Sequence, residues 1–143
     1  MELKHISDCI LFSYHPNPSR VVGFFDNMDG KIYIDETLGL IGREVAYLHE
    51  LSHRECFEKN CWCWKKKTDY WVEYHAFREE FYKVQALGDK RIKRIYLKQL
   101  NDVINSAKKN LPVWHSHIEA LRRLIKMKSF QKYVGRKIKR KLQ

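Results

Sequence analysis

One short segment constrains this chain more than any other, because His49 and His53 stand in the spacing H-E-x-x-H. The surrounding residues predict a helix, and positions four apart on a helix lie on one face, one turn above the other. Two imidazoles placed that way can share one metal ion, and zinc is the usual choice. Glu50, the second residue of the motif, can act as the base on a water that the metal activates.

The residues before the motif predict a β-hairpin. Arg20–Phe25 is rich in β-forming residues, and Lys31–Asp35 alternates apolar and polar residues as a half-buried strand does. The turn between them, Asp26–Gly30, ends in the Asp-Gly pair that is typical of hairpins. Further upstream, residues 6–12 are compatible with the start of a helix or with a short strand. Two prolines predict a loop at residues 15–19.

Helical spacing of apolar residues dominates the rest of the chain. A helix from about residue 38 to 57, capped by Asp35 or Thr37, carries the motif, and Gly88 ends a second helix. The predicted fold class is α+β: one domain over residues 1–143, with a small antiparallel β-sheet packed on a helical bundle and the motif helix central. The later helices are predicted at about 69–87, 89–107 and 112–128, followed by a basic helix or frayed tail at about 129–143.

A catalytic zinc takes three protein ligands and keeps a fourth position for water. Glu73 lies twenty residues after His53, which allows a loop and a return along an antiparallel helix. Two histidines with one glutamate form a known catalytic set. Glu73 could instead be a surface carboxylate, with His75 as the ligand, but His75 points about 200° away around the helix.

The region Gly23–Phe81 resembles the ImmA/IrrE-type zinc peptidases, which occur with prophages, other mobile elements and stress-response repressors. His49–His53 on one helix, and Glu73 with Ala76 on the next, carry the resemblance. It implies a zincin-like fold and a metallopeptidase, a hydrolase that acts on a protein substrate such as a transcriptional repressor. It also implies the roles of single residues: zinc ligands His49, His53 and Glu73, and catalytic base Glu50.

Three cysteines follow the motif closely. Cys56, Cys61 and Cys63 could hold a second, structural zinc ion together with Cys9 or a histidine. Their spacing fits no standard zinc knuckle. The other explanation is a set of thiols in a loop that Trp62 and Trp64 anchor.

Other polar residues near the motif allow two explanations each. His75 could polarise a substrate carbonyl or be a packed or exposed histidine. Glu80, two turns beyond Glu73 on the same helix face, could orient a ligand histidine or be a solvated carboxylate. His115 and His117 lie on different sides of a predicted helix, so we do not expect both to bind one metal.

Basic residues concentrate at the C-terminal end. The net charge is +11, and residues 120–143 contain ten basic residues and no acidic one. Such a charge run can be a solvated helix face, a weak, salt-dependent contact with nucleic acid, or a docking surface for an acidic protein. We favour an ancillary electrostatic role. The alternative functions are a non-catalytic zinc-fold accessory protein that binds nucleic acid or a partner protein through the basic C-terminus, and a structural metalloprotein.

Composition favours a folded protein outside membranes. Hydrophobic residues make up 44% of the chain, yet no run of 18 or more apolar residues occurs, so we expect no membrane-spanning helix. The first residues do not have the pattern of a secretory signal. We therefore expect a cytoplasmic location, where cysteines remain thiols or bind metals.

Overall fold

The computed structural model describes residues 9–12, 22–65 and 69–143. Its three strands form one sheet in the order β1-β3-β2. β2 and β3 pair antiparallel, which confirms the hairpin, whereas β1 pairs parallel with β3. The sheet is therefore mixed and not purely antiparallel as predicted, because β3 has one parallel and one antiparallel neighbour. The predicted loop at residues 15–19 lies outside the described residues. The strands are β1 (Cys9–Phe12), β2 (Gly23–Asp26) and β3 (Lys31–Asp35).

The motif lies on helix α1 (Leu40–Glu58). Asp35 does not cap this helix, because its carboxylate accepts hydrogen bonds from the backbone N and Oγ1 of Thr37, at 2.9 and 2.8 Å, in the turn after β3. Gly39 occupies the N-cap position and offers no side-chain acceptor. The predicted N-cap at Asp35 or Thr37 is therefore wrong, because the hydrogen bonds between these two residues close the turn before α1.

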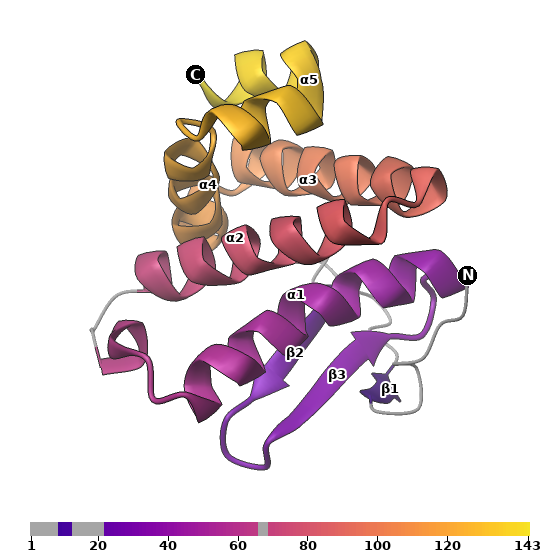
Figure 1. Cartoon of the computed structure of the whole chain (residues 1–143). Coiled ribbons are helices and arrows are strands. Elements are labelled where there is room, and N and C mark those ends of the chain that lie inside the picture. The colour runs from indigo at the N-terminus through magenta and orange to yellow at the C-terminus, as the bar shows by residue number, and fades with distance from the viewer. Residues whose placement is uncertain (1–8, 13–21, 66–68) are drawn as a thin grey trace.

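Four more α-helices follow in the described part of the chain, and Figure 1 shows α1 between the sheet and these helices. Gly88, at φ 62°, follows α2, and Asp89 caps α3. The predicted α+β fold, a small sheet packed on a helical bundle, is confirmed. Among the described residues, no helix combines the length and the apolar character that a membrane span requires. The remaining elements are a 3-10 turn η2 (Trp62–Lys65), α2 (Asp69–Leu87), α3 (Lys90–Lys109), α4 (Leu111–Leu124) and α5 (Lys128–Leu142).

Two apolar clusters hold α1 on opposite sides. In the larger cluster, Val45 and Leu48 of α1 meet buried side chains of the other helices. Because α1 is packed both on the sheet and on the bundle, its motif side chains have fixed positions. The smaller cluster joins β3 to α1 through Ile32, Ile34, Ala46 and Tyr47.

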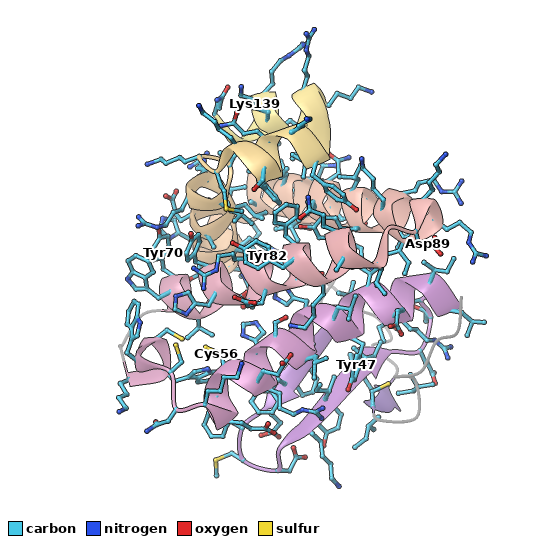
Figure 2. All side chains as sticks on the ribbon, viewed as in Figure 1. Tyr47, Cys56, Tyr70, Tyr82, Asp89 and Lys139 are labelled. Atoms are coloured by element: carbon cyan, nitrogen blue, oxygen red, sulfur yellow. The ribbon has the colours of Figure 1, made fainter. Side chains whose placement is uncertain are left out.

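The C-terminal segment forms helix α5, not a frayed tail. Its apolar residues recur every four positions and are buried, and a kink at Gly135, with φ 86°, divides the helix. Long nitrogen-tipped side chains surround this helix near the labelled Lys139 in Figure 2. The basic segment therefore packs its apolar residues into the core and exposes its charged residues on the outer face. The buried residues are Phe130, Val134, Ile138 and Leu142.

Candidate metal centre and active site

His49 and His53 lie on one face of α1, with ring centroids 4.8 Å apart, and Glu73 of α2 lies opposite. Nε2 of His49 is 3.2 Å from Oε2 of Glu73, and Nε2 of His53 is 3.0 Å from Oε1 of the same carboxylate. The three residues that the sequence singled out as ligands therefore meet in one place.

The donor set fits a zinc ion. Two ligand atoms that are each bound at about 2.0–2.1 Å to a tetrahedral zinc lie about 3.3 Å apart, close to the two nitrogen–oxygen distances observed. His53 and Glu73 are 6% and 9% exposed. A buried carboxylate between two imidazoles favours a cation among them. Within the described residues this group contains three donors, the number that a catalytic zinc uses.

Glu80 of α2 supports this centre from the other side of a ligand. Its Oε1 lies 3.1 Å from Nδ1 of His49, and the residue is 3% exposed. The solvated carboxylate considered from the sequence is therefore excluded. A carboxylate on the second nitrogen of a ligand histidine fixes its tautomer and ring orientation.

The charges of the centre are strongly coupled. Burial alone would lower the pKa of His49, but attraction to Glu80 and hydrogen bonds with Glu73 and Glu80 raise it well above its ordinary value. Burial alone would raise the pKa of Glu73, but the charges of His117 and His53 and hydrogen bonds with both motif histidines lower it well below its ordinary value. The Glu73 carboxylate is therefore anionic at neutral pH.

Glu50 lies beside the ligands and does not belong to their group. It is 6% exposed and lines the pocket in front of the centre. Burial raises its pKa, although the neighbouring His49 and His53 oppose the shift. A carboxyl group with a raised pKa can take a proton and return it. Gly23 of β2 lies next to Glu50, since a Cβ added at Gly23 would lie 3.4 Å from its Cγ.

A pocket of about 490 Å³ adjoins the centre and includes both motif histidines, Glu50 and Glu73 in its lining. β2, η2, α3 and α4 supply the other walls. An apolar pocket with a few polar groups at one place is the usual form of a ligand site. Apolar side chains in the lining include Phe24, Phe25, Trp64, Val103 and Trp114.

α4 adds a polar side chain that the sequence did not place in the site. Nε2 of His117 lies 3.4 Å from Oε1 of Glu73, and the imidazole lines the pocket. Its ring packs against Trp114 at 5.0 Å. His115 is exposed. The available signal was helical spacing, because His117 stands three residues after the apolar Trp114 and so shares its face.

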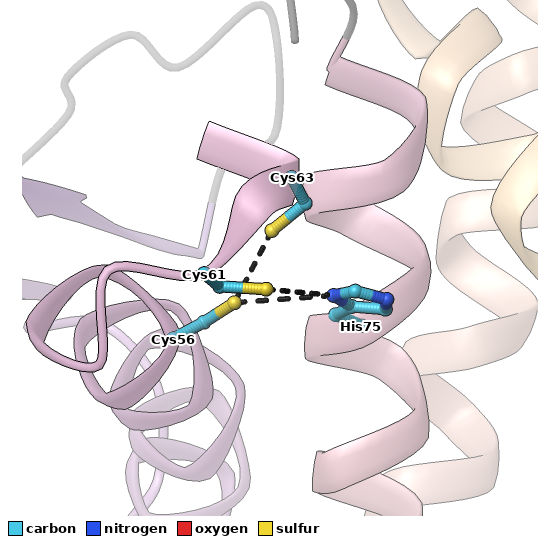
Figure 3. A group of neighbouring side chains, drawn as sticks. All are labelled: Cys56, Cys61, Cys63 and His75. Carbon is cyan, nitrogen blue, oxygen red and sulfur yellow. Dashed lines mark hydrogen bonds between the residues drawn. The ribbon is translucent and has the colours of Figure 1, made fainter. Parts of the chain in front are cut away.

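A second group of potential ligands lies at the C-terminal end of α1 (Figure 3). Cys56, Cys61 and Cys63 gather around His75 of α2, and all four ligand atoms lie within 4.8 Å of one another. Cys9, considered as the fourth ligand, instead packs on β1 against the small cluster between the sheet and α1. His75 therefore faces the cysteines and is not among the residues that line the pocket.

Two groups of side chains in the described part of the chain could thus hold a metal ion. Comparison with protein-family models finds no match, and no match is found among curated proteins or solved structures. Function is therefore inferred from the chemistry of the two groups and of the pocket beside them.

Proposed function

We propose that the protein is a zinc-dependent metallopeptidase that hydrolyses a peptide bond in a protein substrate. One observation carries the proposal: three ligand residues and the buried Glu50 meet at the wall of one pocket. A structural zinc fills its four positions with protein side chains, whereas a catalytic zinc keeps one position for water or substrate. A group of three donors beside a pocket supports the catalytic kind.

Zinc bound in this group supplies a Lewis acid that polarises a carbonyl and lowers the pKa of water. His49, His53 and Glu73 would hold the ion. Glu80 fixes the ring of His49 through Nδ1. Glu50 takes a proton from the attacking water and returns it to the leaving amine. Because burial raises the pKa of Glu50, its carboxyl group can hold the proton between the two transfers.

The position of β2 favours a peptide as the substrate. In the described part of the chain only β3 pairs with β2, and residues from Gly23 to Phe25 line the pocket. The carbonyl oxygen of Val22 accepts a hydrogen bond from the backbone N of Asp35 on β3. Backbone groups alternate between the two sides of a strand, so those of Gly23 and Phe25 turn to the open edge. An extended peptide can pair with such an edge.

The resemblance to ImmA/IrrE-type peptidases supports a folded substrate such as a transcriptional repressor. In such a protein the cut bond would lie in an extended, accessible segment, because only unpaired backbone can add to the edge of β2. A library of unstructured peptides therefore tests the chemistry without knowledge of the natural substrate.

The test is cleavage of such a library by the zinc-loaded protein, with new termini identified by mass spectrometry. We expect the wild type to cleave and Glu50→Gln to be slower by roughly a hundredfold or more, with unchanged zinc content. Glu58→Gln is the matched control, because Glu58 lies on the same helix and is exposed. A zinc-loaded wild type that cuts no peptide, or a Glu50→Gln variant as active as the wild type, would exclude a peptidase.

A second function is supported by the outer face of α5, where Lys132, Arg136 and Arg140 are exposed. Clustered cations bind phosphate backbones in a salt-dependent way. Deletion of α5 is no test, since it would remove Phe130 from the core. A triple glutamine variant removes the charges and keeps the packing. If an accessory nucleic-acid-binding role is correct, this variant loses binding to a DNA duplex, and Glu50→Gln keeps it. Absence of salt-dependent binding by the wild type excludes that role.

A further inference from the structure

We propose that Cys56, Cys61, Cys63 and His75 bind a second zinc ion, which has a structural role. Figure 3 shows the three sulfur atoms and the imidazole directed toward one another, from the end of α1, from the segment around η2 and from α2. This site is separate from the proposed catalytic centre and does not depend on peptidase activity.

The distances between the imidazole nitrogen and the sulfurs are close to those of a tetrahedral zinc site. Two sulfurs bound at about 2.3 Å lie about 3.7 Å apart, and a bound sulfur and nitrogen lie about 3.5 Å apart. Nδ1 of His75 is 3.5 Å from Sγ of Cys61 and 3.9 Å from Sγ of Cys56. Sγ of Cys56 and Sγ of Cys63 are 3.2 Å apart, well beyond the S–S bond of about 2.05 Å in a disulfide.

The chain path after α1 brings the cysteines together. Asn60 adopts a positive φ of 54°, which an asparagine tolerates, and reverses the chain. The backbone N of Cys61 then donates to the carbonyl oxygen of Cys56 at 3.1 Å. Trp64 N donates to the carbonyl oxygen of Cys61 at 3.2 Å and starts the turn that contains Cys63. Backbone geometry thus sets the three sulfur positions.

Neighbouring groups suit a charged ligand set. Three thiolates with one zinc ion carry a net charge of −1, and the charge of Arg78 acts on both Cys61 and His75. The ring of Trp62 packs edge-on against His75 at 5.4 Å. This contact covers one side of the imidazole.

All four positions are filled by protein side chains, which is the mark of a structural zinc site. The ion would tie the end of α1 to α2 and hold the segment that presents Trp64. The ring of Trp64 lies 6.3 Å from His53 and 5.2 Å from Phe57, and it lines the proposed catalytic pocket. The second zinc ion would therefore keep one wall of that pocket in place.

The test is a titration of the metal-free, reduced full chain with cobalt(II), followed by absorption, and zinc analysis of the same samples. We expect two metal ions per chain and a thiolate-to-cobalt charge-transfer band. Cys63→Ser should lose one ion and most of the band. His49→Ala should also lose one ion, but it should keep the band, because the thiolates lie in the other site. Circular dichroism identifies any variant that has not folded.

Cys9→Ser is the matched control, since it also removes one thiol but leaves the four proposed ligands. It should keep both ions and the full band. The proposal is overturned by one metal ion per wild-type chain with no charge-transfer band, or by equal loss of the band in Cys9→Ser and Cys63→Ser. A disulfide between Cys56 and Cys63 in zinc-treated protein would also overturn it.

Discussion

Glu80 and His49 form a buried pair in which Oε1 of the carboxylate lies 3.1 Å from Nδ1 of the imidazole. The other ring nitrogen, Nε2, faces Glu73 at 3.2 Å. The proton of His49 therefore belongs on Nδ1 when a metal occupies Nε2, and Nδ1–H donates a hydrogen bond to Glu80. This contact links the proposed metal ligand to a residue seven positions beyond Glu73 on the same helix.

Glu80→Gln should weaken zinc binding about 10- to 100-fold, because the negative acceptor on Nδ1 is replaced by a neutral amide. Competition with a zinc chelator measures the affinity. Glu79→Gln is the matched control, since Glu79 is the neighbouring residue and is partly exposed. Equal affinities for Glu80→Gln and the wild type would show that the buried pair does not support the metal.

Gly23→Ala should destabilise the fold by about 1–3 kcal/mol. The added Cβ would lie 2.8 Å from the carbonyl oxygen of Tyr33 and 2.9 Å from Cδ1 of Ile34. Chemical denaturation measures the loss. Gly42→Ala is the control, because a Cβ at Gly42 inside α1 would make only ordinary contacts, the nearest to Cβ of Leu38 at 3.5 Å. A variant at Gly23 with wild-type stability would mean that β2 and β3 adjust at no cost.

The elements predicted correctly from the sequence are those in which apolar residues recur with a clear strand or helix period. The β2–β3 hairpin and α2, which Gly88 ends, follow from local residue patterns. The predicted N-cap of α1 was wrong, because Asp35 accepts hydrogen bonds from Thr37 in a turn before the helix. The spacing of residues in the sequence does not reveal this turn. The parallel partner of β3 also depends on a contact between distant segments, which no local pattern encodes.

Some residues of the candidate site were likewise predicted from the sequence, and others were not. Helical spacing brought out His49 and His53, because residues four apart on one helix point together, and the length of chain needed for an antiparallel return brought out Glu73. Two contacts from other segments were not predicted. His117 comes from α4, and the partnership of His75 with the cysteines depends on how the segment after α1 folds back.

Asp89→Ala should lower the melting temperature by a few degrees at about pH 7. Its carboxylate accepts hydrogen bonds from the backbone N of Ile92 and of Arg91, which lower its pKa. Since the folded-state pKa is lowered, this stabilisation is complete above the ordinary pKa of aspartate and is lost as the pH falls through the lowered value. The difference between variant and wild type should therefore shrink in acid.

Thermal unfolding of Asp89→Asn provides the control for charge. An asparagine keeps a side-chain oxygen for the cap but has no charge to titrate. Its melting temperature at about pH 7 should lie between those of the wild type and Asp89→Ala, and the difference between the two variants should change little with pH, because neither side chain titrates. A deficit of Asp89→Ala that grows in acid would contradict the assigned cap.

Phe130→Ala should cost about 3–5 kcal/mol of unfolding free energy, because it empties a fully buried position where α5 meets α2. The ring of Phe130 lies 5.1 Å from that of Phe81. Lys132→Ala, two residues further on the exposed face, should change stability little. Urea denaturation separates the two cases. Similar, small effects of both substitutions would mean that α5 is dispensable to the core.

His117→Gln should weaken zinc binding roughly tenfold, less than Glu80→Gln does. This order of effects follows from geometry. Nε2 of His117 lies 3.4 Å from Oε1 of Glu73, and the His117 side chain is 30% exposed. Glu80 lies nearer to its partner His49 and is buried. Chelator competition on both variants gives the order. His115→Gln, on the exposed side of α4, should match the wild type. Complete loss of zinc from His117→Gln would instead make His117 a ligand.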